Sequence, residues 1–173
     1  GTITPASQTG SSVNLSWSRA TDNTTAQADL QYRVYRSTAD NIDTTADMTA
    51  NGTAVETFAA DLSNKTVSSL DDATTYFFNI MVKDETGNAS AYTAVSTTTN
   101  DITPPTPGTL SVDSSSDNSV TLDWTGSSDN GSGTLSYRIF TSTSNNINSV
   151  NTLLANGTTY DVAMDAVQSP KTV

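Results

Sequence analysis

The sequence contains no cysteine and no histidine among its 173 residues. Without cysteine, neither a disulfide framework nor a zinc–thiolate site is available. Without histidine, a Ser-His-Asp triad and histidine-based acid–base chemistry are excluded. The absence of cysteine does not decide the cellular compartment, because extracellular domains can be stable without disulfides.

Basic residues are also scarce, with 7 Lys and Arg against 18 Asp and Glu and a formal net charge of −11. The few basic side chains are scattered, whereas nucleic-acid binding needs a concentrated positive surface. No stretch approaches the roughly 18 consecutive apolar residues of a membrane-spanning helix. We therefore expect no nucleic-acid partner and no membrane insertion.

The sequence contains an internal repeat. A repeat of this length predicts the domain architecture more directly than any local pattern. The matching pairs are 1–17 with 108–124, 30–42 (LQYRVYRSTADNI) with 135–147 (LSYRIFTSTSNNI), 50–53 with 155–158 (both ANGT), and 65–67 with 171–173 (both KTV). The repeat predicts one domain over 1–100, a Pro-rich linker over 101–107, and a second domain over 108–173 that is truncated after about its fifth strand.

Apolar residues alternate with polar ones in three stretches, which indicates half-buried β-strands. The three stripes are Val13, Leu15 and Trp17; Leu30, Tyr32 and Val34; and Tyr76, Phe78, Ile80 and Val82. Residues 84–88 have the composition of a turn, 92–99 predict a final strand, and 44–50 form the one weakly helical patch. The pattern predicts an all-β protein.

These residues resemble the fibronectin type III family in its bacterial branch. The resemblance is carried by Trp17 on the second strand, Tyr32-x-Val34 on the third, Leu70-x5-Tyr76 with its following stripe, KDETGNAS at 83–90, and NDITPPTPG at 100–108. It implies an immunoglobulin-like β-sandwich with sheets A-B-E and C'-C-F-G, in two tandem modules. Trp17, Tyr76 and Trp124 would belong to the structural core.

The second copy has no counterpart of Leu70 to Thr99, so we expect it to lack its last two strands and to leave strand C with an open edge. Three explanations stay open. The sequence is cut short, another chain supplies the strands, or the partial fold is stable by itself. An open edge is a docking or aggregation site.

Acidic loop residues suggest a calcium site, since Ca²⁺ prefers carboxylate and carbonyl oxygens. In the family topology Asp71, Asp72, Asp101 and Asp129 would converge at the junction between the copies. A second group, at the far end of copy one, comprises Asp22, Asp29, Asp84 and Glu85. The alternative is that these acidic residues only stabilise turns.

Outward positions on strands C and F place Tyr35, Phe77 and Met81 together as a candidate apolar interface patch. The alternative is that residues 44–58 cover this patch. Paired carboxylates occur, but short sandwich loops rarely form the cleft that catalysis requires. We therefore expect no enzyme activity within this chain.

The sequence thus predicts a non-catalytic extracellular spacer or adhesion module of a bacterial surface or secreted protein. Its partners would be other modules of the same protein, neighbouring subunits or glycans. Two alternatives remain: a structural subunit of an extracellular filament assembled by strand exchange, and an accessory carbohydrate-binding module of a secreted enzyme. No cofactor is expected beyond the candidate Ca²⁺.

Overall fold

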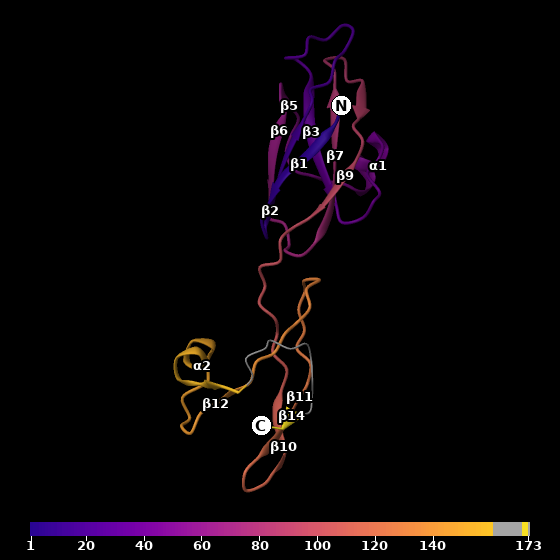
Figure 1. The fold of residues 1–173 in the computed structure, drawn as a ribbon. Coiled ribbons are helices and arrows are strands. Elements are labelled where there is room, and N and C mark those ends of the chain that lie inside the picture. The colour runs from indigo at the N-terminus through magenta and orange to yellow at the C-terminus, as the bar shows by residue number, and fades with distance from the viewer. Residues whose placement is uncertain (161–170, 173) are drawn as a thin grey trace. The chain divides into compact units, whose positions relative to one another are not determined.

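The computed structural model describes residues 1–160, 171 and 172. The chain divides into two compact units, Gly1–Ile102 and Thr103–Val173 (Figure 1). Each unit is described by itself below. Neither helix among the described residues is long or apolar enough to cross a membrane.

The first sheet of unit 1 contains β1 (Ile3–Gln8), β2 (Ser12–Trp17) and β6 (Asn64–Ser68), in the order β1-β2-β6. All pairings are antiparallel, and a bulge interrupts the β1–β2 register between Pro5 and Ser7. The predicted stripe on β2 faces inward, because Val13, Leu15 and Trp17 are all buried. The period-two pattern therefore set the inner face of this sheet correctly.

The second sheet of unit 1 is built on two long strands, and its elements are β3 (Gln31–Ser37), β4 (Thr53–Ala54), β5 (Ala59–Ala60), β7 (Thr75–Lys83), β8 (Ala89–Ala91) and β9 (Val95–Thr98). Its order is β4-β3-β7-β8, while β5 also pairs with β3 and β9 with β7. Of the final strand predicted over 92–99, the structure forms only β9, while β8 lies before the predicted range and the buried Tyr92 stands between the two.

The main core lies between these two sheets (Figure 1). It combines the inward stripes of β2, β3 and β7, and its largest fully buried side chains include Tyr32, Phe78 and Leu15. The tilted rings of Trp17 and Tyr32 pack with their centroids 6.3 Å apart. Trp17 and Tyr76, which the sequence placed in the core, are buried there at 6% and 5% exposure.

A second, smaller core lies on the other face of the β3–β7 sheet, beneath α1 (Thr45–Asn51). Tyr35 and Met81 are buried at 6% and 7% exposure, and they pack with Ile42 and Met48. The prediction of an exposed patch of Tyr35, Phe77 and Met81 is therefore wrong for unit 1. The segment before and through α1 covers these residues, with Phe77 half-buried at the edge.

Asn79 of β7 links this covering segment to the sheet by hydrogen bonds. Its side chain is fully buried, and its Nδ2 donates to the carbonyl oxygen of Ile42 at 2.7 Å and to that of Asp43 at 3.4 Å. The strand pattern indicated only that Asn79 points away from the main core. Its partner carbonyls lie 37 and 36 residues away along the chain, so local periodicity does not find them.

Unit 2 repeats part of this arrangement. One sheet contains β10 (Leu110–Ser115), β11 (Val120–Trp124) and β14 (Lys171–Thr172), with the order β10-β11-β14. A short ladder joins β12 (Phe140–Thr141) to β13 (Thr158–Thr159), and α2 (Val150–Asn156) precedes β13. The bulge between Val112 and Ser114 falls at the same repeat position as that in unit 1.

Candidate functional site

The two repeats build the same local contacts from equivalent residues. The ring centroids of Trp124 and Tyr137 lie 6.1 Å apart, close to the spacing of the Trp17–Tyr32 pair. The hydroxyl oxygen of Tyr137 accepts from the backbone N–H of Ser127, just as that of Tyr32 accepts from Ala20. These matches let each position of unit 2 be compared directly with its counterpart in unit 1.

Burial differs sharply between the repeats. Leu110 is 65% exposed, whereas its counterpart Ile3 is 4% exposed. Trp124 is only half-buried, although the buried Trp17 occupies the same repeat position. The assignment of Trp124 to a closed core is thus corrected, because the described residues of unit 2 provide no counterpart of β7 to cover it.

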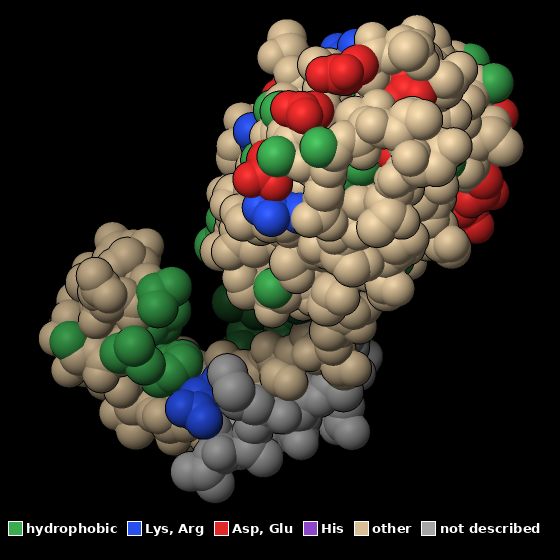
Figure 2. All heavy atoms as spheres, turned by 90° about the horizontal axis from the view of Figure 1, so that it is seen from above, with side chains coloured by type: hydrophobic (Ala, Val, Ile, Leu, Met, Phe, Trp, Pro, Cys, Tyr) green, Lys and Arg blue, Asp and Glu red, His purple; other side chains and the backbone are tan. Residues whose placement is uncertain are grey.

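The result is an open apolar cavity of about 410 Å³ within unit 2, which we call the open face. Its apolar lining includes Leu110, Leu122, Trp124, Ile139, Phe140 and Leu153. Figure 2 shows hydrophobic side chains gathered on the part of the surface that unit 2 forms. Of the six large hydrophobic residues that are prominently exposed among the described residues, five belong to unit 2. We take the open face as the candidate interaction site of unit 2.

One edge of the open face carries an incomplete strand. β12 has two residues, whereas its counterpart β3 has seven. β3 is held on both sides by β4 and β7, while the described residues give β12 a strand neighbour only in β13. Among the described residues β12 therefore lacks the second row of ladder hydrogen bonds that β3 makes with β7.

Of the three candidate calcium ligands in unit 1, Asp71 and Asp72 make hydrogen bonds within the structure. A carboxylate oxygen of Asp72 accepts from the backbone N–H of Ile102 at 3.2 Å. The backbone N–H of Asp71 donates to the Tyr76 hydroxyl at 3.1 Å, and Asp101 lies exposed nearby in sequence. Asp129 belongs to unit 2. The described part of the chain holds no group of three or more acidic side chains placed to hold a metal ion. The junction site stays a prediction.

The acidic residues at the other end of unit 1 organise their own loops. Asp22 accepts hydrogen bonds from the backbone N–H groups of Thr25 and Thr24 and from the Thr24 hydroxyl, and these lower its pKa to about 2. The side chain of Asn88, with smaller contributions from Thr86 and the turn backbone, lowers the pKa of Asp84. Both carboxylates stabilise turns, whereas Asp29 and Glu85 are exposed.

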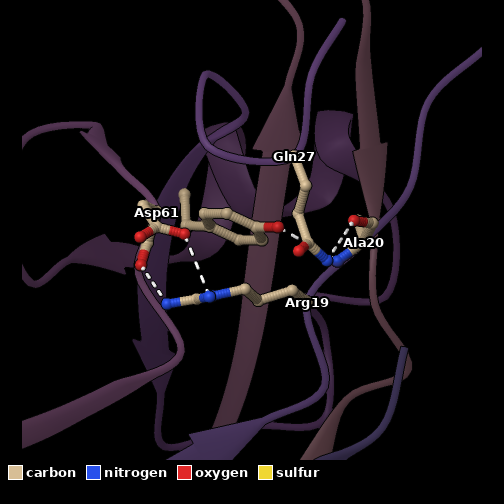
Figure 3. Close-up of polar contacts among 5 residues, drawn as sticks. Arg19, Ala20, Gln27 and Asp61 are labelled. Atoms are coloured by element: carbon tan, nitrogen blue, oxygen red, sulfur yellow. Dashed lines mark hydrogen bonds and ion pairs between the residues drawn. The ribbon is translucent and has the colours of Figure 1, made fainter.

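A polar cluster at the same end holds the connection from β2 to β3 (Figure 3). Arg19 forms an ion pair with the Asp61 carboxylate at 3.1 Å and also donates to the Asp61 carbonyl at 3.0 Å. Gln27 donates to the carbonyl of Ala20 at 3.4 Å, and the Ala20 N–H donates to Tyr32. These contacts link the β2–β3 connection to Asp61, which lies between β5 and β6, and to Tyr32 of β3, so the cluster positions the connection.

The strand order of unit 1 is that of the expected fibronectin type III sandwich. The two sheets of unit 1, β1-β2-β6 and β4-β3-β7 with β8 and β9, are the A-B-E and C'-C-F-G sheets of the expected sandwich. Tyr76 is the second residue of β7, and its hydroxyl accepts a hydrogen bond from the backbone N–H of Asp71 upstream, which is the tyrosine corner of such sandwiches. The chain belongs to the fibronectin type III family. It carries one full module and, by its repeat, part of a second.

Two bacterial proteins are similar to this tandem. The chain is 36% identical over 146 residues to Exoglucanase B and 34% identical over 150 residues to Exoglucanase A, both of Cellulomonas fimi. The matches cover 80% and 82% of the chain, but the chain spans only 12% and 15% of the length of these relatives. No family model matches the chain.

Solved structures with some likeness to the chain include a two-domain fibronectin type III segment of chicken tenascin. That likeness has a TM-score of 0.41 and 17% identity, and covers 99% of this chain and 80% of the other. The central fibronectin type III array of RIM-binding protein gives a TM-score of 0.36 and 18% identity, with 72% of this chain and 41% of the other covered.

Proposed function

We propose that this chain is a non-catalytic module pair of a secreted bacterial protein, in which it sets the distance between neighbouring domains. The observation that carries the proposal is the extent of the similarity to the two exoglucanases. The matches run over 146 and 150 residues, which is longer than either unit, so both cross the Pro-rich junction. The relatives therefore share the arrangement of both repeats, and not just one module.

The same comparison favours a non-catalytic role. Most of the length of each exoglucanase has no counterpart in this chain, so the activity in their names is not carried over to it. An extracellular location fits a module of a secreted enzyme, and the name of each relative supports this setting. The acidic surface, with a net charge of −11, favours solubility in such a setting.

The first residues of the junction are hydrogen-bonded to the rest of unit 1, as a spacer of defined length requires. The backbone N–H of Asn100 donates to the carbonyl of Thr9 at 3.0 Å, and that of Ile102 donates to Asp72. A Cβ on Gly10 would lie 2.6 Å from the Ile102 side chain, so the glycine makes room for this contact. Beyond it, three prolines restrict φ and favour extended backbone.

The spacer role is tested by distance distributions between spin labels. Because the chain has no cysteine, Asp40→Cys and Ser116→Cys place one label on an exposed position of each unit. We expect a narrow distribution, and a broader one when Pro104, Pro105 and Pro107 are all replaced by Gly. Thr103→Ser is the matched control. A wild-type distribution already as broad as that of the glycine variant would refute the spacer role.

A second candidate is an accessory carbohydrate-binding module, because both relatives are named exoglucanases. Cosedimentation of the chain with insoluble cellulose tests this candidate. Retention on cellulose that soluble cello-oligosaccharides displace would favour it over the spacer role, and full recovery in the supernatant would exclude it for cellulose.

A further inference from the structure

The chain contains three Asn–Gly sequences, at Asn51–Gly52, Asn130–Gly131 and Asn156–Gly157. Such a pair can lose the asparagine amide without an enzyme, because a glycine without Cβ lets its own backbone nitrogen approach the preceding side chain. Asparagine counts among the thermolabile residues of proteins. Whether the reaction proceeds depends on how the glycine nitrogen and the asparagine side chain are held in the folded chain.

The Asn51–Gly52 pair is held at the end of α1. The backbone N–H of Gly52 donates to the carbonyl oxygen of Met48 at 3.1 Å, and Nδ2 of Asn51 donates to the carbonyl oxygen of Asn41 at 2.9 Å. A Cβ on Gly52 would lie 2.7 Å from the Met48 carbonyl oxygen, so this helix end requires glycine. Both groups that would react are thus held by hydrogen bonds.

The Asn156–Gly157 pair is held in the same way at the end of α2. The backbone N–H of Gly157 donates to the carbonyl oxygen of Leu153 at 3.0 Å, and Nδ2 of Asn156 donates to that of Asn146 at 3.0 Å. The second repeat therefore keeps the asparagine, the glycine and both hydrogen bonds. At these two positions the Asn–Gly sequence has a structural role in ending a helix.

The Asn130–Gly131 pair lies between β11 and β12, outside the helices and strands of the described residues. Asn130 is exposed, and the backbone N–H of Gly131 donates to no described residue. The loop is open here, since no described atom lies within 4 Å of the place that a Cβ on Gly133 would take. This pair therefore lacks the hydrogen bond that restrains the glycine nitrogen in the other two.

We propose that Asn130 is a site of spontaneous deamidation, from which Asn51 and Asn156 are protected by their helix ends. The backbone nitrogen of Gly131 gives up its proton to hydroxide and bonds to Cγ of Asn130. The bond from Cγ to Nδ2 breaks, and Nδ2 takes a proton from water and leaves as ammonia. Water then opens the resulting succinimide ring at either carbonyl, which leaves an aspartate or an isoaspartate at position 130.

The position of Asn130 gives this modification a consequence for the Pro-rich junction. Ser128, two residues before it, pairs with Thr106 of the junction through backbone hydrogen bonds of 2.7 and 3.1 Å. An isoaspartate adds one carbon to the backbone, and both products add a negative charge to this loop. We expect the pairing of Thr106 to be weakened as a result. Its relevance to spacing rests on the proposed spacer role, whereas the deamidation itself does not.

The test incubates the full chain at mildly alkaline pH and follows the three sites by peptide mass spectrometry, which distinguishes asparagine from aspartate and isoaspartate. We expect Asn130 to convert at least about tenfold faster than Asn51 or Asn156, because reaction at the helix ends requires local opening. In denaturant, where the helix ends are lost, the three rates should become similar. Equal rates in the folded chain, or an equally large difference in denaturant, would overturn the proposal.

Matched glycine variants complete the experiment. Gly131→Ala should slow the conversion of Asn130 at least about tenfold, because a Cβ hinders the approach of the backbone nitrogen. Gly133→Ala changes the same loop without following an asparagine, and it should leave the rate unchanged. An unchanged rate in Gly131→Ala would contradict attack by the Gly131 nitrogen.

Hydrogen exchange tests the consequence for the junction. Anion exchange separates the converted chain from the unconverted chain, because conversion adds a negative charge. The converted fraction should show faster exchange at the Thr106 amide, which donates to Ser128 in the unmodified chain. Unchanged protection of that amide would overturn the link to the junction, while conversion at Asn130 would still support the modification itself.

Discussion

At the scale of single residues, the two tryptophans show that the same residue in the same repeat position is buried to different extents. Trp17 is 6% exposed between two sheets, and Trp124 is half-buried on the open face. Each packs against the tyrosine of its own repeat at nearly the same ring distance. The local pair therefore forms from the repeat alone, while full burial requires the second sheet.

Replacing Trp17 by Ala should destabilise unit 1 by about 3–5 kcal/mol, the usual cost of removing a large buried aromatic side chain. Denaturant unfolding followed by far-UV circular dichroism measures this change. Trp17→Phe should cost clearly less, because the ring continues to fill most of the space. A loss below about 1 kcal/mol for the alanine variant would mean that Trp17 does not lie between the sheets.

Asp22 gives unit 1 a pH dependence below pH 4. Its pKa falls from 3.8 to about 2 on folding because Thr25 and Thr24 donate to the carboxylate. Between these values the unfolded chain binds more protons, so this stabilisation is present above pH 4 and is lost as the pH falls towards 2. An NMR titration of the Asp22 carboxyl carbon should show the low midpoint, and Thr24→Ala should raise it. An unchanged midpoint near 3.8 would contradict this assignment.

At the scale of elements, the segment through α1 covers the outer face of the β3–β7 sheet in unit 1. Thr44 caps α1 with a reciprocal capping box involving Asp47, and Met48 of the helix is fully buried. In unit 2, Ser149 and Thr152 repeat the capping box, but none of the described α2 residues is buried. Capping thus specifies the helix in both repeats, and only the complete sheet provides the surface beneath it.

Asn79→Ala should destabilise unit 1 by about 1–3 kcal/mol, because the carbonyls of Ile42 and Asp43 lose their buried donor. Hydrogen exchange should show faster exchange across residues 42–58, with β2 and β6 little affected. Thr75→Ala, at an exposed position of the same strand, is the control and should stay within about 0.5 kcal/mol of wild type. A uniform loss of amide protection over the whole of unit 1 would argue against a role of Asn79 that is limited to holding residues 42–58 on the sheet.

At the scale of the whole molecule, the repeats differ in how completely they close a core. The described residues place all fully buried large hydrophobic side chains in unit 1. Unit 1 also retains both sheets, with each apolar stripe facing another. We therefore expect the stability of unit 1 not to depend on residues beyond Ile102.

Residues 1–102 produced alone should fold and unfold in one cooperative transition, as small single domains do. Circular dichroism and tryptophan fluorescence should report the same midpoint, with the emission of a buried indole. Residues 103–173 produced alone are the comparison, and they should show the emission of a more exposed indole. Separate midpoints for the two probes on residues 1–102 would contradict an independent first module.

The sequence by itself determined the repeat, the all-β class, the inward stripes of β2, β3 and β7, and a helical patch over 44–50, which forms as α1 over Thr45–Asn51. These features follow from periods of two and from capping, which depend on neighbouring residues. Only the tertiary structure decided that Tyr35 and Met81 are covered, that Asn79 fastens the covering segment, and that Trp124 lies on an open face. Each of these features depends on contacts between segments that are distant in the sequence. The local pattern predicts to which face of a strand a side chain points, but not which segment packs against that face.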